Sequence, residues 1–187
     1  MESIEEVLLD TDDKMQKSTA FLLEQFSGLR TGKASPALVE NIEISYYGTP
    51  TRLRELAGIA TPEPRLIVIN AYDPSVLAEI EKAILAANLG VTPMNDGRVV
   101  RVPIPELSEE RRKDMTKLAK RIAEEGRVAI RNIRRDSNDQ SKSLQKNAKA
   151  TEDERDEALK DIQKSTDRYI KQIDVALSAK EAEIMEV

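Results

Sequence analysis

The residues with the clearest chemical potential are the basic ones between positions 111 and 135. This window contains ten Lys or Arg residues against only three acidic residues, Asp114, Glu124 and Glu125. Lysine and arginine bind phosphate oxygens, and the planar guanidinium also makes bidentate contacts and stacks on nucleobases. The window is therefore a candidate surface for an anionic partner such as RNA.

The spacing of these residues places most of them on one face of a helix. Projection at about 100° per residue puts seven of them within about 60° of one direction. We call these seven the basic stripe: Lys113, Lys117, Lys120, Arg127, Arg131, Arg134 and Arg135. The helix also has an apolar seam of Met115, Leu118, Ile122, Gly126, Ala129 and Ile133, rejoined at Leu144, and all of these up to Ile133 except Gly126 project near 180°. The stripe is therefore expected to lie diametrically opposite the core.

A run of charge on a helix is more often a solvated face than a binding site. Such a face mixes signs, so that neighbours three and four positions apart form ion pairs. Glu124 is the only acidic residue among the seven basic positions, and an anionic partner would relieve the repulsion along the stripe. The sequence favours nucleic acid, although the net charge of the chain is −5. The alternative is a helical protein–protein interaction factor that binds an acidic partner through the same stripe.

Catalytic constellations are missing from the sequence. The chain has no His and no Cys, which removes the commonest general base, the thiolate nucleophile and the commonest transition-metal ligands. Residues 28–33 resemble a phosphate-binding loop, but the glycines are one residue too close and Ala34 stands where Ser or Thr would hold magnesium. The segment 136–139 lacks the glycine and the late glutamate of a calcium loop. We expect no catalytic residue, no cofactor and no metal site, and therefore a binding factor.

The aromatic residues are concentrated in Tyr46-Tyr47-Gly48-Thr49-Pro50. Strand alternation would point one tyrosine inward and the other outward. The segment is either strand-end packing before a turn or an exposed contact tip, and each interpretation can hold for one tyrosine.

Three stretches carry the periodicity of long amphipathic helices. The first runs from Ile4 to Leu29, after a capping box of Ser3 and Glu6. The second spans about 108–146, and the third, over about 151–184, begins with a capping box of Thr151 and Glu154. The second helix would be close to 60 Å long at about 1.5 Å per residue, and a helix of this length cannot bury its apolar seam alone. The three are expected to form an elongated bundle.

Residues 31–105 read differently, because they hold all eight prolines and five of the seven glycines. Short β-prone runs occur at 42–47, 56–60, 66–70, 91–94 and 99–104. One helix fits 75–87, between Asp73-Pro74 and Gly90, and residues 95–97 read as a turn. The sequence thus predicts a small α+β domain inserted into a bundle made of residues 1–30 and 106–187. The chain would cross twice, near 30–35 and near 103–105, at a hinge.

No run approaches the roughly 18 apolar residues of a membrane span. The first residues, Met1-Glu2-Ser3-Ile4-Glu5-Glu6, have neither the cationic flank nor the apolar run of a targeting signal. We therefore expect a cytoplasmic protein without a membrane partner.

Four blocks of the sequence together resemble the ribosome recycling factor family. They are Arg30–Pro36, Tyr46–Pro50, Leu107–Asp114 and Val128–Asp136. The resemblance implies an α+β protein, an elongated three-helix bundle with an inserted β/α/β domain in an L shape, acting as a monomer. It implies that the chain works with elongation factor G, and with GTP hydrolysis by that partner, to split post-termination ribosomes into subunits and release them from mRNA.

The resemblance also implies roles for particular residues. Arg134, flanked by Arg131 and Arg135, matches the arginine block that contacts large-subunit ribosomal RNA. Arg30 and Lys33 match the basic hinge positions, with Lys33 where many members have Arg. Arg127, Lys117 and Lys120 join the RNA-binding set by helix geometry. The hinge itself is assigned to the two crossings: Arg30, Thr31, Gly32, Pro103 and Pro105.

Overall fold

The computed structural model describes residues 3–186, so Met1, Glu2 and Val187 of the sequence lie outside the described residues. By its contacts the chain divides into two compact units. The first comprises Met1–Phe26 and Thr116–Ala182, and the second comprises Ser27–Met115 and Glu183–Val187.

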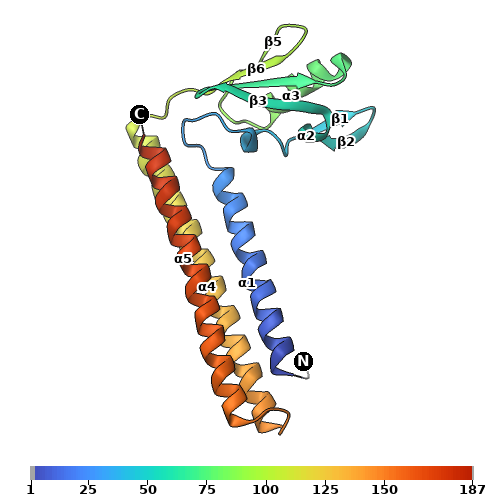
Figure 1. Cartoon of the computed structure of the whole chain (residues 1–187). Helices are drawn as coiled ribbons and strands as arrows, with labels where there is room; N and C mark the ends of the chain where they lie inside the picture. Colours follow the sequence, from blue (N-terminus) through green and yellow to red (C-terminus); the bar gives the residue numbers. More distant parts are fainter. Residues whose placement is uncertain (1–2, 187) are drawn as a thin grey trace. The chain divides into compact units, whose positions relative to one another are not determined.

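The first unit contains most of three long helices, α1 (Ile4–Ser27), α4 (Glu109–Lys146) and α5 (Glu152–Met185), as Figure 1 shows. The predicted capping box of Thr151 and Glu154 is present with both of its bonds, and Ser3 caps α1 through one bond. The Ser3 hydroxyl accepts a hydrogen bond from the Glu6 amide at 3.2 Å. The Glu154 carboxylate accepts from the Thr151 amide at 2.7 Å, while the Thr151 hydroxyl accepts from the Glu154 amide at 3.2 Å. The bond from the Thr151 amide, and a second one that the Thr151 hydroxyl donates to the same carboxylate at 2.8 Å, lower the pKa of Glu154.

The buried face of α4 differs from the predicted seam. Leu118, Ile122 and Ile133 are only partly buried. The fully buried positions are Ala119, Ala123, Gly126, Ile130, Ser137, Ser141 and Leu144. At about 100° per residue, this face is rotated by roughly 70° from the predicted one, toward Arg127 and Arg134.

The rotation follows from α4 having two neighbours. A Cβ built on Gly126 would lie 2.1 Å from Leu22 Cδ1 of α1 and 3.4 Å from Ile173 Cδ1 of α5, so both helices reach α4 at this point. Only small side chains fit where two helices approach together, and the larger apolar residues flank the contact. The predicted seam included Gly126 at this contact, and Leu144 further along, but it otherwise followed larger side chains and left out Ala119 and Ala123.

Polar side chains also lie within the helical unit. The hydroxyls of Thr11 on α1 and Ser137 on α4 are 2.6 Å apart, and both residues are buried. Between α1 and α5, the Tyr169 hydroxyl donates to the Asp12 carboxylate at 3.2 Å. On α1, Thr11 and Val7 are buried, whereas the predicted core residues Ile4 and Leu8 are only partly covered.

The second unit contains two antiparallel sheets. Strands β1 (Glu43–Tyr46) and β2 (Thr49–Arg52) form a hairpin, followed by the short helix α2 (Leu53–Leu56). The larger sheet has the order β3-β4-β6-β5. Its strands are β3 (Ala57–Glu63), β4 (Leu66–Ala71), β5 (Met94–Asn95) and β6 (Val100–Pro103). Alternate residues of β4 and β6 are buried, Ile67 and Ile69 on one and Val100 and Val102 on the other.

Helix α3 (Leu77–Ala86) follows a 3-10 turn at Pro74–Val76 and buries Ile80 and Ile84 in the core of the second unit. The helix predicted over 75–87 is thus confirmed, and the Asp73 carboxylate caps the turn by accepting from the Ser75 amide at 2.9 Å. The strand predicted at 91–94 is wrong, because pairing begins only at Met94. The sequence also missed β2 and α2. Within residues 3–186, no helix is long and apolar enough to span a membrane.

Candidate nucleic-acid interface

Six of the seven residues of the basic stripe lie on α4 within the helical unit. They are Lys117, Lys120, Arg127, Arg131, Arg134 and Arg135. The seventh, Lys113, belongs to the second unit and pairs with Glu109 at 2.8 Å, one helical turn away. The structure therefore gathers the predicted cations of positions 117–135 on one helix, beside α5.

One edge of the stripe faces α5 rather than solvent. Lys120 and Arg127 lie seven residues apart, and each meets an acidic residue of the antiparallel helix. Arg127 donates two hydrogen bonds to Asp174 Oδ1, from Nε at 2.9 Å and from Nη2 at 2.6 Å. The Lys120 ammonium lies 3.3 Å from Glu181 Oε1. We call this row of contacts, together with the next step described below, the α4–α5 ladder.

The next step of the ladder, seven residues further along α4, is weaker. Arg134 Nη1 donates to the side-chain oxygen of Gln163 at 3.3 Å, and the Gln163 amide donates to Asp167 at 2.8 Å. Arg134 therefore meets a neutral amide instead of a carboxylate. Much of its positive charge is left uncompensated by the helix beside it.

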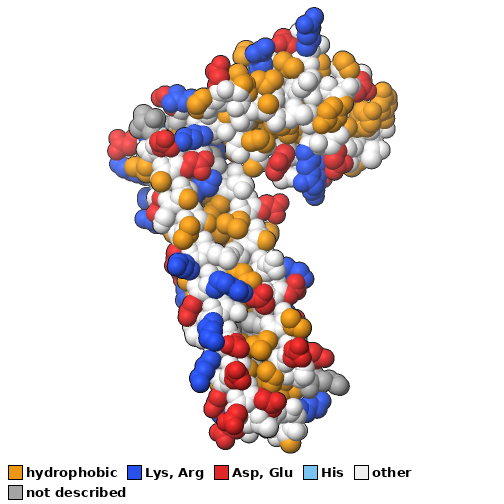
Figure 2. All heavy atoms as spheres, viewed as in Figure 1, with side chains coloured by type: hydrophobic (Ala, Val, Ile, Leu, Met, Phe, Trp, Pro, Cys, Tyr) orange, Lys and Arg blue, Asp and Glu red, His pale blue; other side chains and the backbone are white. Residues whose placement is uncertain are grey.

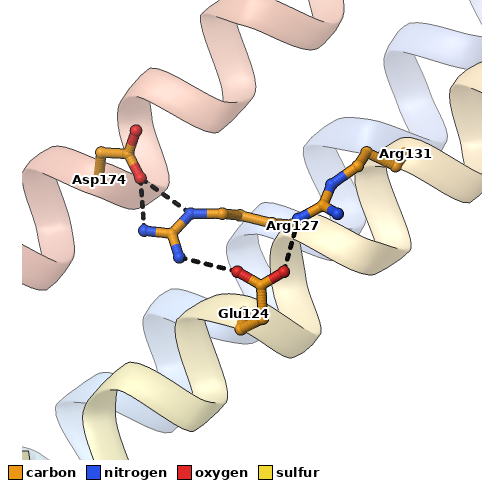
Figure 3. Close-up of polar contacts among 4 residues, drawn as sticks. All are labelled: Glu124, Arg127, Arg131 and Asp174. Carbon is orange, nitrogen blue, oxygen red and sulfur yellow. Dashed lines mark hydrogen bonds and ion pairs between the residues drawn. The ribbon is translucent and has the colours of Figure 1, made fainter.

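Glu124 joins two arginines of the stripe, as Figure 3 shows. Its carboxylate accepts from Arg131 Nη2 at 2.6 Å and from Arg127 Nη1 at 3.1 Å. These bonds, that of Arg131 above all, hold the pKa of Glu124 below its ordinary value. The carboxylate of Asp174, followed by that of Glu124, raises the pKa of Arg127, which is only 24% exposed.

Two cations of the stripe remain without a partner. Within residues 3–186, neither Lys117 nor Arg135 forms an ion pair or a hydrogen bond through its side chain, and both are exposed. Together with Arg134 they are the residues of the stripe best placed to bind an external anion. Arg127, by contrast, is paired with both Asp174 and Glu124, so its charge is largely compensated within the protein.

The predicted geometry of the stripe needs correction. It does not lie diametrically opposite the buried face of α4, because that face is turned toward Lys120, Arg127 and Arg134. Sequence projection of α4 alone also missed Asp174, Glu181 and Gln163 on α5. A signal was present, since the basic positions 120, 127 and 134 and the acidic positions 181, 174 and 167 share a seven-residue spacing in opposite directions.

The basic residues of the first crossing have partners inside the second unit. Arg30 Nη2 donates to the backbone oxygen of Asn88 at 3.0 Å. Lys33 forms an ion pair with Glu186, and the buried Thr31 hydroxyl donates to Glu183 at 2.7 Å. Gly32 between them has φ of +81°, a conformation that favours glycine.

At the second crossing, Pro103 ends β6 opposite Leu66. Pro105 follows two residues later, and Leu107 packs beside Gly32, with its Cγ 3.6 Å from where a Cβ would stand. Both predicted crossing segments therefore have an ordered conformation in the second unit.

The lowered pKa of Glu124 gives a prediction about pH. A carboxyl group whose pKa is lower in the folded than in the unfolded chain stabilises the fold fully above the unfolded value, about 4.3 for glutamate, and loses this effect as pH falls through the folded value. Replacing Arg131 with Ala should raise the pKa of Glu124 further than replacing Arg127 with Ala, because the Arg131 bond is shorter. An NMR titration of the Glu124 side-chain carboxyl carbon measures both changes. The pKa of Glu154 should stay constant as an internal control, and equal effects of the two variants would contradict the assignment.

Comparison with known proteins gives a consistent result. The family model described as "Ribosome recycling factor" matches residues 22–185. The ribosome-recycling factors of Pelotomaculum thermopropionicum and Syntrophomonas wolfei are both 50% identical to the chain. Their matches cover 97% and 98% of this chain and 98% and 100% of the relatives.

Solved structures agree with these sequence matches. A solution structure of the ribosome recycling factor matches with a TM-score of 0.81 and 38% identity, over 98% of both chains. A second match, with a TM-score of 0.71 and 42% identity, covers 98% of this chain and 100% of the other. It comes from models of the T. thermophilus ribosome recycling factor and the E. coli elongation factor G bound to the E. coli post-termination complex.

These matches place the chain among non-enzymatic translation factors. It belongs to the ribosome recycling factor family. The α+β fold and the long helices with a small β unit, expected from the resemblance, are confirmed.

Proposed function

We propose that the chain acts with elongation factor G to separate post-termination ribosomes into subunits and so release them from mRNA. Family membership supports this proposal, as does the structural relative that is bound, together with elongation factor G, to a post-termination complex. In this proposal the elongation factor hydrolyses GTP and the chain contributes binding surfaces. It would act as a monomer in the cytoplasm, where ribosomes are found.

The basic stripe is the proposed docking surface for large-subunit ribosomal RNA. The observation that carries this assignment is the unequal pairing along α4. Lys117 and Arg135 have no side-chain partner in the described part of the chain, and Arg134 is held only by an amide. Uncompensated cations on one ordered helix suit contacts to phosphates, which dominate the affinity of RNA-binding surfaces. Lys120, Arg127 and Arg131 would line the same surface.

The two crossing segments are the proposed hinge of the inserted domain. Arg30, Thr31 and Gly32 belong to one crossing, and Pro103 and Pro105 to the other. In this proposal residues 31–105 move relative to a bundle of residues 1–30 and 106–187 when the elongation factor acts. Lys33 would exchange its ion pair with Glu186 for an RNA phosphate, and Arg30 would bind RNA nearby.

Subunit separation followed by light scattering tests the proposal. Post-termination ribosomes should dissociate when the chain, elongation factor G and GTP are all present, and should remain intact when any one is omitted. The isolated chain should hydrolyse no GTP. Dissociation by the chain without the elongation factor, or no dissociation with all components, would contradict the proposed function.

A second candidate is a protein-binding factor that holds an acidic partner through the same stripe. It is supported by the carboxylates that already occupy part of the stripe, Glu124, Asp174 and Glu181. Binding to free ribosomal RNA fragments separates the two candidates. An RNA-binding stripe should retain the fragments, whereas binding that survives nuclease removal of the RNA would favour the protein partner.

A further inference from the structure

The β1–β2 hairpin ends in a tyrosine with an unusual backbone conformation. Tyr46 pairs with Thr49, so the turn consists of Tyr47 and Gly48. Both have positive φ, +47° and +82°, which is the pattern of a type I′ turn. The first turn position favours Asn, Asp or Gly, and a bulky residue there is strained. The fold of the second unit accepts this strain without burying the side chain, because Tyr47 is 81% exposed.

The exposed tyrosine is nonetheless held in a defined position. Its ring lies 4.7 Å from that of Tyr46, centre to centre, with the ring planes inclined by 74°. Tyr46 is half-buried and packs against the core of the second unit, and the fully buried Ile44 anchors the same strand. Apolar side chains are visible on the surface at the end of the second unit where the hairpin lies (Figures 1 and 2). A pre-positioned aromatic ring loses little conformational entropy on binding.

The charge around the tip indicates the class of partner. Residues 45–51 contain no Lys, Arg, Asp or Glu, although 34% of the chain is charged. The flanking residues Glu43 and Arg52 lie opposite each other across the hairpin, and their charges cancel. Binding to RNA depends on cations that neutralise phosphates, and the tip offers none. A tyrosine with an apolar ring and a polar hydroxyl instead suits a protein pocket with a polar rim.

We propose that the hairpin tip is a protein-docking element, in which the Tyr47 side chain inserts into an apolar pocket of a protein partner. This inference rests on the proposed function only in that the partner is met in the post-termination complex. The backbone strain at Tyr47 then has a functional reason: this position favours asparagine, and a tyrosine is kept there because its side chain binds the partner.

The variant Tyr47→Asn separates the effect of this residue on the stability of the turn from its effect on binding the partner. Because asparagine suits the first position of a type I′ turn, the thermal midpoint of the variant should rise, by about 2–4 °C on the usual scale for chains of this size. Its subunit-separating activity should fall by about tenfold or more, as for the loss of a buried aromatic anchor. Binding to large-subunit RNA should not change, and Tyr47→Phe should keep most of the activity.

Tyr72 provides the matched control, since it is similarly exposed, at 74%, and lies outside the hairpin. Tyr72→Asn should leave the separating activity unchanged. Full activity of Tyr47→Asn, or an equal loss in Tyr72→Asn, would overturn the proposal. If the unmodified chain itself failed to separate ribosomes, the proposed function would fail and the docking element would still be tested by cross-linking.

A photoreactive benzoylphenylalanine at position 47 identifies the partner directly. With ribosomes and elongation factor G present, irradiation should give an adduct that protease degrades and ribonuclease leaves intact. The same group at position 72 should give little or none. An adduct with RNA would show that the ring stacks on a base, and the lack of any adduct would show that the tip is free. Either result would overturn the protein-docking proposal.

Discussion

Replacing Arg131, Arg134 and Arg135 together with alanine is expected to weaken binding to large ribosomal subunits by roughly 10³-fold or more. Hydrogen bonds to charged groups contribute about 1.5–3 kcal/mol each, and about 1.4 kcal/mol corresponds to tenfold in affinity. Arg134→Ala alone should give a smaller loss in the same direction. Co-sedimentation of the chain with large subunits measures the affinity.

The salt dependence of the same binding provides a second measurement. For a single-stranded nucleic acid, log affinity falls against log salt with a slope of about −0.7 for each phosphate neutralised. The triple variant should therefore have a slope that is shallower by about two. The control is the triple variant Lys14→Ala, Lys17→Ala and Lys164→Ala, which removes the same charge from ion-paired lysines on α1 and α5. Equal losses in both triple variants would show that net charge alone matters and that the stripe has no special role.

Gly126→Ala is expected to destabilise the helical unit, although alanine is the better helix former. The new Cβ would lie 2.1 Å from Leu22 Cδ1, and Leu22 is 2% exposed, so its end cannot turn into solvent. Overpacking of a core costs about 1–3 kcal/mol. The higher helix propensity of alanine over glycine offsets about 1 kcal/mol of this cost. We expect a net loss of up to about 2 kcal/mol, measured as a lower midpoint in thermal or urea unfolding.

A second substitution tests the cause of that loss. Leu22→Val shortens the side chain and removes Cδ1, the atom that the new Cβ would meet, so the double variant should lose less stability than the two single variants added together. Gly58→Ala is the matched control, because its Cβ would meet only the Asn70 oxygen at 3.9 Å. Strict additivity in the double variant, or an equal loss in Gly58→Ala, would argue against overpacking at Leu22.

The fold could be predicted from the sequence wherever the signal was local. The Thr151–Glu154 capping box and the Asp73 cap depend on a few adjacent residues, and both are present in the structure. The alternation of β4 and β6 also depends on one strand at a time. Strand β2 was missed because Thr49-Pro50-Thr51-Arg52 lacks an apolar pattern and exists through its pairing with β1. The buried face of α4 was misjudged because two neighbouring helices decide it together.

At the candidate site, too, the features that depend on one helix could be predicted and those that depend on a second helix could not. The members of the basic stripe follow from spacing along one helix, and the structure places six of them on α4 within the helical unit. Their degree of pairing could not be predicted from that helix alone. Asp174 and Glu181 come from a different helix, and only the antiparallel alignment of α4 and α5 brings them to Arg127 and Lys120. The distinction between paired and available arginines is therefore a tertiary property.

The seven-residue spacing of the α4–α5 ladder also limits how the two helices can slide past each other. If α5 were displaced by three residues, Arg127 would face Lys171 and position 134 would face Lys164. Such an alignment would bring like charges together at two steps at once. The cations proposed to bind RNA thus also help to set the axial alignment of α5 along α4. Without these cations, the alignment of α5 would depend on apolar packing, on the Gly126 contact and on the bond from Tyr169 to Asp12 of α1.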